Sequence, residues 1–158
     1  MNARKALGLA LLAAGLLLAP GDRSFGQAKK SNSVVKAKAE AGKVGADGKQ
    51  VVTITLDVDP KFHIYANPVG NDDFSSNETS VSITSKAKLG GVKVDYPAGV
   101  VKKDKVLGDY KIYKGKVTIK ATVKRAKGDT APLQVAVKLQ ACSKKACLTP
   151  ATVKLSVP

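Results

Sequence analysis

The chain has 158 residues and carries 27 basic against 12 acidic side chains, which gives a formal net charge of +15. It contains two cysteines, one histidine and no tryptophan. This length allows one domain with its own core. Neither a Ser-His-Asp grouping nor a glycine-rich phosphate loop is recognisable, which argues against catalysis on a small-molecule substrate.

Residues 1–26 have the pattern of a secretory signal peptide. Arg4 and Lys5 supply positive charge, and residues 6–20 are almost wholly Ala, Leu and Gly. This apolar stretch is shorter than the roughly 20 residues of a membrane-spanning helix. We therefore expect export, cleavage before Gln27, no stable membrane insertion, and a mature protein in the periplasm or secreted.

The basic excess raises nucleic acid as a partner. Loss of residues 1–26 removes three basic and one acidic side chain and lowers the net charge only from +15 to +13. However, lysines alternate with apolar residues in residues 34–38 and 117–124, which is typical of the solvated face of a sheet. No aromatic stacking platform accompanies the charge. The sequence therefore disfavours nucleic acid and leaves anionic envelope surfaces or acidic partners open.

Period-two alternation dominates the chain after a polar segment, residues 27–33, that we expect to be a disordered linker. Alternation of apolar and polar residues predicts β-strands, and clusters of Gly, Asp, Asn and Pro between them predict turns. The predicted strands cover residues 34–38, 50–58, 79–84, 92–96, 115–123, 133–139 and 151–157.

The strand pattern predicts an all-β fold. About seven or eight short strands at this spacing, without a competing helical period, are typical of an antiparallel sandwich. We expect a single immunoglobulin-like β-sandwich domain over residues 34–158, with no internal repeat and no second domain.

The two cysteines, Cys142 and Cys147, lie in the run Gln-Ala-Cys-Ser-Lys-Lys-Ala-Cys-Leu-Thr-Pro at residues 140–150. Between two predicted strands this spacing favours a hairpin in which the cysteines face each other within disulfide reach. In an exported protein such a pair forms a disulfide more readily than a metal site. A disulfide that closes so small a ring stabilises the fold by only about 2 kcal/mol, so stabilisation alone would be a weak reason for it.

Charge near the cysteines leaves two interpretations open. Lys144 and Lys145 lie inside the predicted hairpin loop. Nearby ammonium groups lower the pKa of a thiol and favour exchange chemistry. In a chain this rich in lysine, the same residues are equally well explained as solvated turn residues. The bridge is therefore either redox-active or permanently structural.

This run resembles the signature of the N-terminal periplasmic domain of the thiol:disulfide interchange protein DsbD. Two upstream stretches agree with the resemblance: Phe-His-Ile-Tyr-Ala-Asn-Pro at residues 62–68, and residues 94–97 followed by Leu-Gly-Asp-Tyr-Lys-Ile-Tyr at 107–113. The matches follow in order over residues 34–158. The resemblance implies an immunoglobulin-like domain whose cysteines cycle between dithiol and disulfide.

The resemblance also implies roles for individual residues. Cys147 would be the attacking thiol and Cys142 the thiol that resolves the mixed disulfide, with His63 and Tyr65 lining the site. A cap loop that shields the pair would lie at Asp104, Val106 and Leu107. The aromatic residue usual at the tip of this loop in the family is absent here, and Lys105 stands where the family has an acidic residue. We therefore expect the shielding of the cysteines and the local electrostatics to differ from those of the family.

The function implied is an envelope relay that passes electrons from a transmembrane donor to thioredoxin-like or other envelope proteins, a chemistry that serves cytochrome c biogenesis. Because the chain lacks a transmembrane bundle and a thioredoxin-like domain, we expect the electrons to come from a separate protein. We also expect the chain to be a monomer. The alternative is a non-catalytic immunoglobulin-like binding or scaffolding module.

We expect neither a cofactor nor a metal. The only histidine, His63, could complete a Cys-Cys-His set, but three scattered ligands without an acidic partner make zinc or copper unfavourable. We expect His63 to be half-buried beside the thiols, with a pKa near neutrality that helps proton transfer.

Overall fold

A computed structural model describes residues 29–158 of the chain. The predicted signal peptide, residues 1–26, and residues 27–28 of the predicted linker lie outside the described residues. Within 29–158 the chain forms eleven β-strands and two 3-10 helices, η1 (Ser31–Ser33) and η2 (Asp72–Asn77). Neither of these helices has the length and apolar character needed to cross a membrane.

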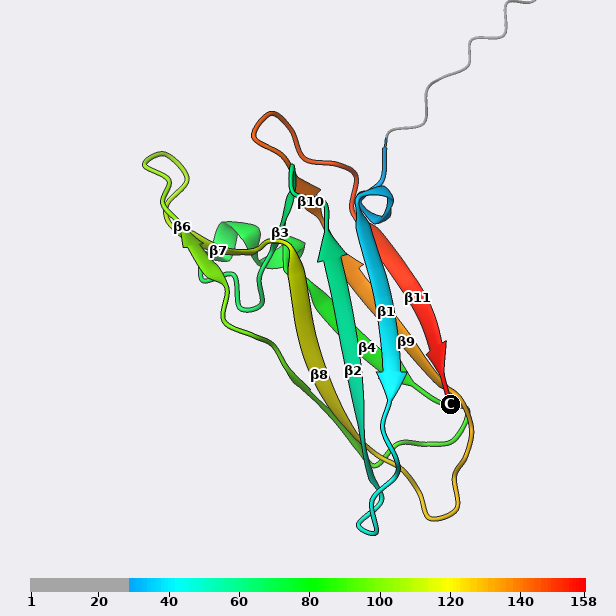
Figure 1. The fold of residues 1–158 in the computed structure, drawn as a ribbon. Helices are drawn as coiled ribbons and strands as arrows, with labels where there is room; N and C mark the ends of the chain where they lie inside the picture. The colour runs from blue at the N-terminus through cyan, green and yellow to red at the C-terminus, as the bar shows by residue number, and fades with distance from the viewer. Residues whose placement is uncertain (1–28) are drawn as a thin grey trace, which may run out of the picture.

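The strands form three antiparallel sheets (Figure 1). The first has the order β1 (Val35–Ala41), β2 (Lys49–Val58), β8 (Lys116–Lys124) and β5 (Gly91–Asp95). The second has the order β11 (Ala151–Val157), β9 (Leu133–Leu139) and β4 (Ser80–Thr84). The third has the order β10 (Ala141–Cys142), β3 (His63–Tyr65), β7 (Tyr110–Tyr113) and β6 (Val100–Lys102).

The main core lies between the first and second sheets, because period-two alternation gives each strand one apolar face. Ile54 of β2, Ile119 of β8 and Val137 of β9 are fully buried members of this core. Lysines occupy the solvated side of β1 and β8. The predicted antiparallel β-sandwich is confirmed, and the short strands β3, β6, β7 and β10 are added to it.

The third sheet lies at the end of the sandwich opposite the β1–β2 connection (Figure 1). The chain passes from the second sheet into the third between Leu139 of β9 and Ala141 of β10. This change of sheet carries the cysteine segment out of the sandwich layers and places it at that end.

The N-terminal segment contradicts the prediction of a disordered linker for residues 29–33. Lys30 forms a parallel β-bridge with Thr149, and Ser31 is fully buried. The amide and the hydroxyl of Ser31 both donate to the carbonyl oxygen of Thr149, at 2.9 and 2.8 Å. Polar composition suggested disorder, but here the polar groups pair with backbone.

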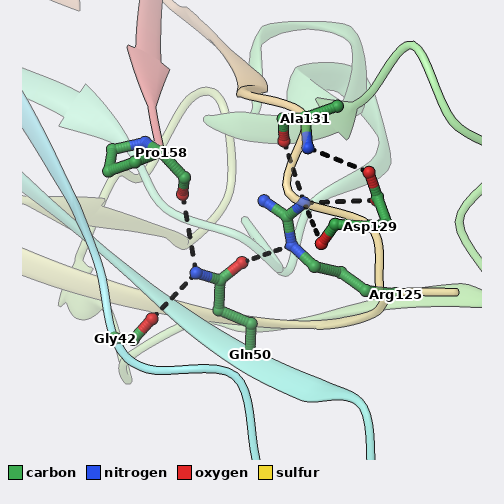
Figure 2. Close-up of polar contacts among 6 residues, drawn as sticks. All are labelled: Gly42, Gln50, Arg125, Asp129, Ala131 and Pro158. Carbon is green, nitrogen blue, oxygen red and sulfur yellow. Dashed lines mark hydrogen bonds and ion pairs between the residues drawn. The ribbon is translucent and has the colours of Figure 1, made fainter. Parts of the chain in front are cut away.

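A buried ionic network stabilises the opposite end of the molecule (Figure 2). The Arg125 side chain is buried; its Nε donates to Gln50 Oε1 at 2.7 Å, and its Nη1 contacts Asp129 Oδ2 at 3.2 Å. The same Nη1 donates to the carbonyl oxygen of Ala131 at 2.8 Å, and Gln50 Nε2 donates to that of Gly42 at 2.8 Å. The guanidinium group therefore joins the β8–β9 connection to β2, and Gln50 extends the network to the β1–β2 connection.

We predict that Arg125→Ala lowers the free energy of unfolding by about 3 kcal/mol, because it leaves the buried carboxylate of Asp129 without a counter-charge. Urea denaturation measures this loss. Lys120→Ala, on the solvated face of β8, the strand that ends directly before Arg125, is the matched control and should change stability by less than about 0.5 kcal/mol. Equal stabilities for the two variants would contradict a structural role for the network.

Candidate functional site

The cysteine segment forms a small hairpin that closes on a disulfide. Cys142 and Cys147 are bonded, with their Cα atoms 3.9 Å apart, and they form an isolated antiparallel bridge. The Ser143 amide donates to the Ala146 carbonyl at 2.9 Å, and the Leu148 amide donates to the Ala141 carbonyl at 2.8 Å. The predicted pairing of the cysteines across a hairpin is confirmed.

The two cysteines differ in exposure. Cys142 is only 3% exposed, because β10 pairs with β3 and sets Cys142 opposite His63 in the third sheet. Cys147 and the turn before it are exposed. An incoming thiol can therefore approach the disulfide from the side of Cys147, while Cys142 lies against the protein.

A second, smaller apolar cluster covers Cys142. Its members come from strands of the third sheet and from the connection between β3 and β4, which contains η2. Alternation along β3 puts His63 and Tyr65 on the same face, and Tyr65 is paired with Ile112 of the neighbouring strand β7. The cluster consists of Tyr65, Val69, Tyr110, Ile112, Cys142 and the half-buried Phe74.

The side chain of Phe74 packs against this cluster. It lies on η2, where the side chain of Asn71 caps the helix by accepting from the Asp73 amide at 3.1 Å. Its ring stacks on Tyr65 at 5.3 Å between centroids and tilts against Tyr110 at 4.7 Å. Such aromatic contacts add stability beyond the area they bury, so Tyr65 is held in place beside the sulfur.

Tyr65 makes the one polar contact with a cysteine sulfur among residues 29–158. Its hydroxyl lies 3.7 Å from Cys142 Sγ, and since a disulfide sulfur carries no proton, the hydroxyl is the donor. Burial and then the neighbouring Tyr110 raise the pKa of Tyr65, against the opposing effect of Lys102. The hydroxyl therefore keeps its proton at neutral pH and can donate to a thiolate at this position.

His63 corrects the expectation of a pKa near neutrality. Its side chain is 8% exposed, and burial lowers its pKa from 6.5 to about 4, with further contributions from Lys102 and Lys114. The imidazole is therefore neutral at physiological pH. It cannot act there as a proton donor in its charged form.

Lys102 is a charged neighbour of this site that the sequence interpretation did not include. Its Nζ lies 2.6 Å from the Tyr110 hydroxyl and 5.0 Å from the centroid of that ring. Its charge acts on both His63 and Tyr65. A fixed positive charge close to the cluster favours the thiolate form of a cysteine in it.

The predicted cap residues occupy a separate loop between β6 and β7. The Asp104 carboxylate accepts from the amides of Leu107 and Val106, both at 3.0 Å, and these bonds lower its pKa. The Leu107 carbonyl accepts from Asn71 Nδ2 at 2.9 Å. In Figure 1 this loop and the cysteine loop stand apart at the same end of the molecule.

The structure thus brings His63 and Tyr65 to Cys142, whereas Asp104, Val106 and Leu107 contact their own loop and Asn71. Sequence reasoning missed Phe74, Tyr110 and Ser31 near the site. A lone aromatic in the polar stretch at residues 71–77 was a usable signal for Phe74, because such a ring needs a partner to pack against. Among residues 29–158, no cluster of three or more His, Cys, Asp or Glu side chains is arranged to hold a metal ion.

Comparison with known proteins gives one family. The sequence model for the N-terminal part of the thiol:disulfide interchange protein DsbD matches residues 31–157. No curated protein sequence matches the chain.

Solved structures share the fold at low identity. The reduced DsbD N-terminal domain of Neisseria meningitidis has a TM-score of 0.52 at 16% identity, covering 80% of this chain and 85% of that one. A DsbD–PilB N-terminal domain complex from the same organism gives 0.51 at 14%, covering 89% and 88%. The N-terminal periplasmic domain of ScsB from Proteus mirabilis gives 0.50 at 18%, covering 77% of this chain and 44% of that one. These likenesses confirm the predicted immunoglobulin-like fold.

The lowered pKa of His63 predicts a pH-dependent stability. Below pH 6.5 the unfolded chain binds a proton at His63, whereas the folded imidazole resists protonation down to about pH 4. Stability from this group is therefore complete above pH 6.5 and is lost as the pH falls toward 4. Urea unfolding of the oxidised protein should show a loss on the order of 1 kcal/mol between pH 7.5 and 5.

His63→Phe should abolish this loss, whatever its effect on stability at pH 7.5. The comparison is made within each variant, so a packing change does not affect it. The same dependence in both proteins would show that His63 titrates normally.

Proposed function

The chain belongs to the family of the N-terminal domain of the thiol:disulfide interchange protein DsbD, and on this premise we propose that it is a thiol-disulfide exchange module of the bacterial envelope. It relays electrons between a transmembrane or thioredoxin-like donor and periplasmic protein disulfides through Cys142 and Cys147. The unequal exposure of the two cysteines carries this proposal: Cys147 is accessible, while Cys142 is 3% exposed.

In the reducing half of the cycle, a donor thiolate attacks Cys147 Sγ, the accessible sulfur. The S–S bond breaks, and its electron pair leaves on Cys142 Sγ. A second donor thiolate then attacks the donor's own sulfur in the mixed disulfide and releases Cys147. The donor ends as a disulfide, and this chain ends as a dithiol after two protons are taken from solvent.

In the oxidising half, the Cys147 thiolate attacks one sulfur of a substrate disulfide. The substrate S–S bond breaks, the other substrate sulfur leaves as a thiolate, and a mixed disulfide with Cys147 forms. The Cys142 thiolate then attacks Cys147 Sγ and expels the second substrate thiol. Two electrons pass to the substrate, and the Cys142–Cys147 bridge forms again. Cys142 and Cys147 are only five positions apart in sequence, and their Cα atoms lie 3.9 Å apart in the bridged form. The resolving sulfur therefore stays beside the mixed disulfide.

Two neighbours support Cys142 as the sulfur that leaves and later resolves. The Tyr65 hydroxyl, 3.7 Å away, can donate to the thiolate formed there, and the raised pKa of Tyr65 keeps that proton in place. The ammonium group of Lys102 adds a positive charge on the same side of the sheet. Stabilising the thiolate makes Cys142 a better leaving group.

The partner surface proposed for this module is the β6 edge and the loop that follows it. Four exposed apolar side chains lie there: Val100, Val101, Val106 and Leu107. β6 and β10, which carries Cys142, are the two edge strands of the same sheet. A partner seated on β6 therefore reaches the disulfide by spanning β7 and β3, a width of about 15 Å. Lys103 is ion-paired with Asp109 of the same loop, whereas Lys105 stands exposed among the apolar residues. The fitting partner therefore has an apolar surface with an acidic group at its rim.

A protein partner and an envelope location have support from relatives. The N. meningitidis DsbD N-terminal domain forms a complex with the N-terminal domain of PilB. The P. mirabilis ScsB domain is periplasmic. We propose thioredoxin-like proteins as partners and the periplasm as the location, reached through the predicted signal peptide.

The decisive test is the reduction potential of the Cys142–Cys147 pair, measured by thiol trapping in glutathione buffers. We expect reduction of both cysteines in the folded domain at a potential less negative than roughly −300 mV. In the presence of an oxidised thioredoxin, Cys142→Ser should accumulate a mixed disulfide through Cys147, and Cys147→Ser should not, because the remaining thiol is buried.

A bridge that resists reduction until the domain unfolds would overturn the relay. That outcome would leave the alternative, a binding or scaffolding module with a structural disulfide.

The proposed docking surface predicts a selective effect of Val106→Asp. Val106 is 89% exposed, so the variant should fold normally. Loss of about 1 kcal/mol of apolar contact should slow electron exchange with a reduced thioredoxin about fivefold. Reduction by dithiothreitol, which needs no docking surface, should be unchanged.

Val44→Asp is the matched control, since Val44 is also exposed but lies in the β1–β2 connection at the other end (Figure 1). An equal effect of both variants on exchange with thioredoxin would remove β6 and its loop as the docking surface.

A further inference from the structure

Ser31 binds both stems of the cysteine hairpin, that is, the residues directly before Cys142 and those directly after Cys147. Ser31 itself lies outside the hairpin. Its hydroxyl donates to the Thr149 carbonyl at 2.8 Å and accepts from the Ala141 amide at 2.9 Å. Ala141 directly precedes Cys142, and Thr149 lies just beyond Cys147. Ser31 is 0% exposed, so water does not compete for these bonds.

Other contacts also join the stems. Cys142 and Cys147 form a backbone bridge, and the Ser143 amide donates to the Ala146 carbonyl at 2.9 Å. Beyond the hairpin, the stems continue into β9 and β11, where Leu139 pairs with Ala151. The Leu148 amide donates to the Ala141 carbonyl at 2.8 Å, and Gln140 Nε2 donates to the Leu148 carbonyl at 3.1 Å. The disulfide itself is the covalent tie, and reduction removes it. In the dithiol, hydrogen bonds hold the stems together, and the Ser31 bonds come from a segment more than a hundred residues away in sequence.

We propose that Ser31 is a positioning residue that holds the reduced cysteines in the geometry of disulfide closure. The proposal rests on the redox cycle proposed above. When two thiols are held close, formation of the bridge loses less conformational entropy, and the effective concentration of one thiol at the other rises. Ser31 therefore makes the disulfide form more readily and lowers the reduction potential of the pair.

The two redox states respond differently to loss of this hydroxyl. Removal of Ser31 Oγ leaves the buried Ala141 amide without its acceptor in both states, which costs stability in both. In the oxidised state the bridge still fixes the stems. In the reduced state the stems can relax, so the dithiol regains conformational entropy and its freed Ala141 amide can bond to water. The reduced form therefore loses less stability than the oxidised form, and closure of the bridge becomes less favourable.

The experiment compares Ser31→Ala with wild type in glutathione buffers, where the dithiol and glutathione disulfide exchange with the bridged form and two glutathione thiols. We expect the equilibrium constant for closure to fall about tenfold, which corresponds to a potential about 30 mV less negative. Urea unfolding should show that the substitution destabilises the oxidised form more than the reduced form, by about 1.4 kcal/mol, which is the equivalent of the tenfold fall in closure. Ser33→Ala is the matched control, because Ser33 Oγ donates within the same segment, to the Lys30 carbonyl, and is exposed.

Equal destabilisation of both forms with an unchanged potential would overturn the proposal and leave Ser31 a structural residue. A second measurement needs no variant: hydrogen exchange at the Ala141 amide of the wild-type protein should remain slow after reduction. Rapid exchange in the dithiol would show that Ser31 releases the stems, which also contradicts the proposal. Failure of the relay is a separate outcome, since it appears as a wild-type bridge that cannot be reduced in the folded state.

Discussion

The arrangement of the site depends on one backbone constraint, the passage of the chain from the second sheet to the third between β9 and β10. Backbone pairing of Ala141 and Cys142 with β3 fixes which side of the segment faces the protein. This pairing buries Cys142 together with its neighbour Ala141. The hairpin turn then leaves Cys147 in solvent. An unequal pair of sulfurs is therefore a consequence of strand register.

The electrostatic surroundings of the buried sulfur favour an anion without offering a base. His63 is kept neutral by burial and by nearby lysines, and Tyr65 is kept protonated by burial. Lys102 supplies a fixed positive charge against Tyr110. A thiolate at Cys142 would face a hydroxyl donor and an ammonium group, so its charge is accommodated where an unpaired buried charge would otherwise be costly.

The two ends of the molecule are built differently. At one end, Arg125 binds Gln50 and Asp129 inside the protein and fixes the connecting segments. At the other end, a short hairpin is held by a disulfide and backbone bonds, and a separate loop exposes apolar side chains. A site that must open its bridge and admit a partner needs such a locally weak element on a rigid scaffold.

Sequence alone determined the sandwich and the identity of the disulfide pair, because period-two alternation and the spacing of Cys142 and Cys147 are local patterns. It also placed His63 and Tyr65 at the site, through a family resemblance. Tertiary structure decided what depends on distant contacts: the stacking of Phe74 on Tyr65, the low pKa of His63, and the cap loop standing apart from the cysteines. The polar segment at Ser31 looked disordered because its bonding partners lie at the far end of the sequence. No local pattern can reveal such partners, since only the closed fold brings them together.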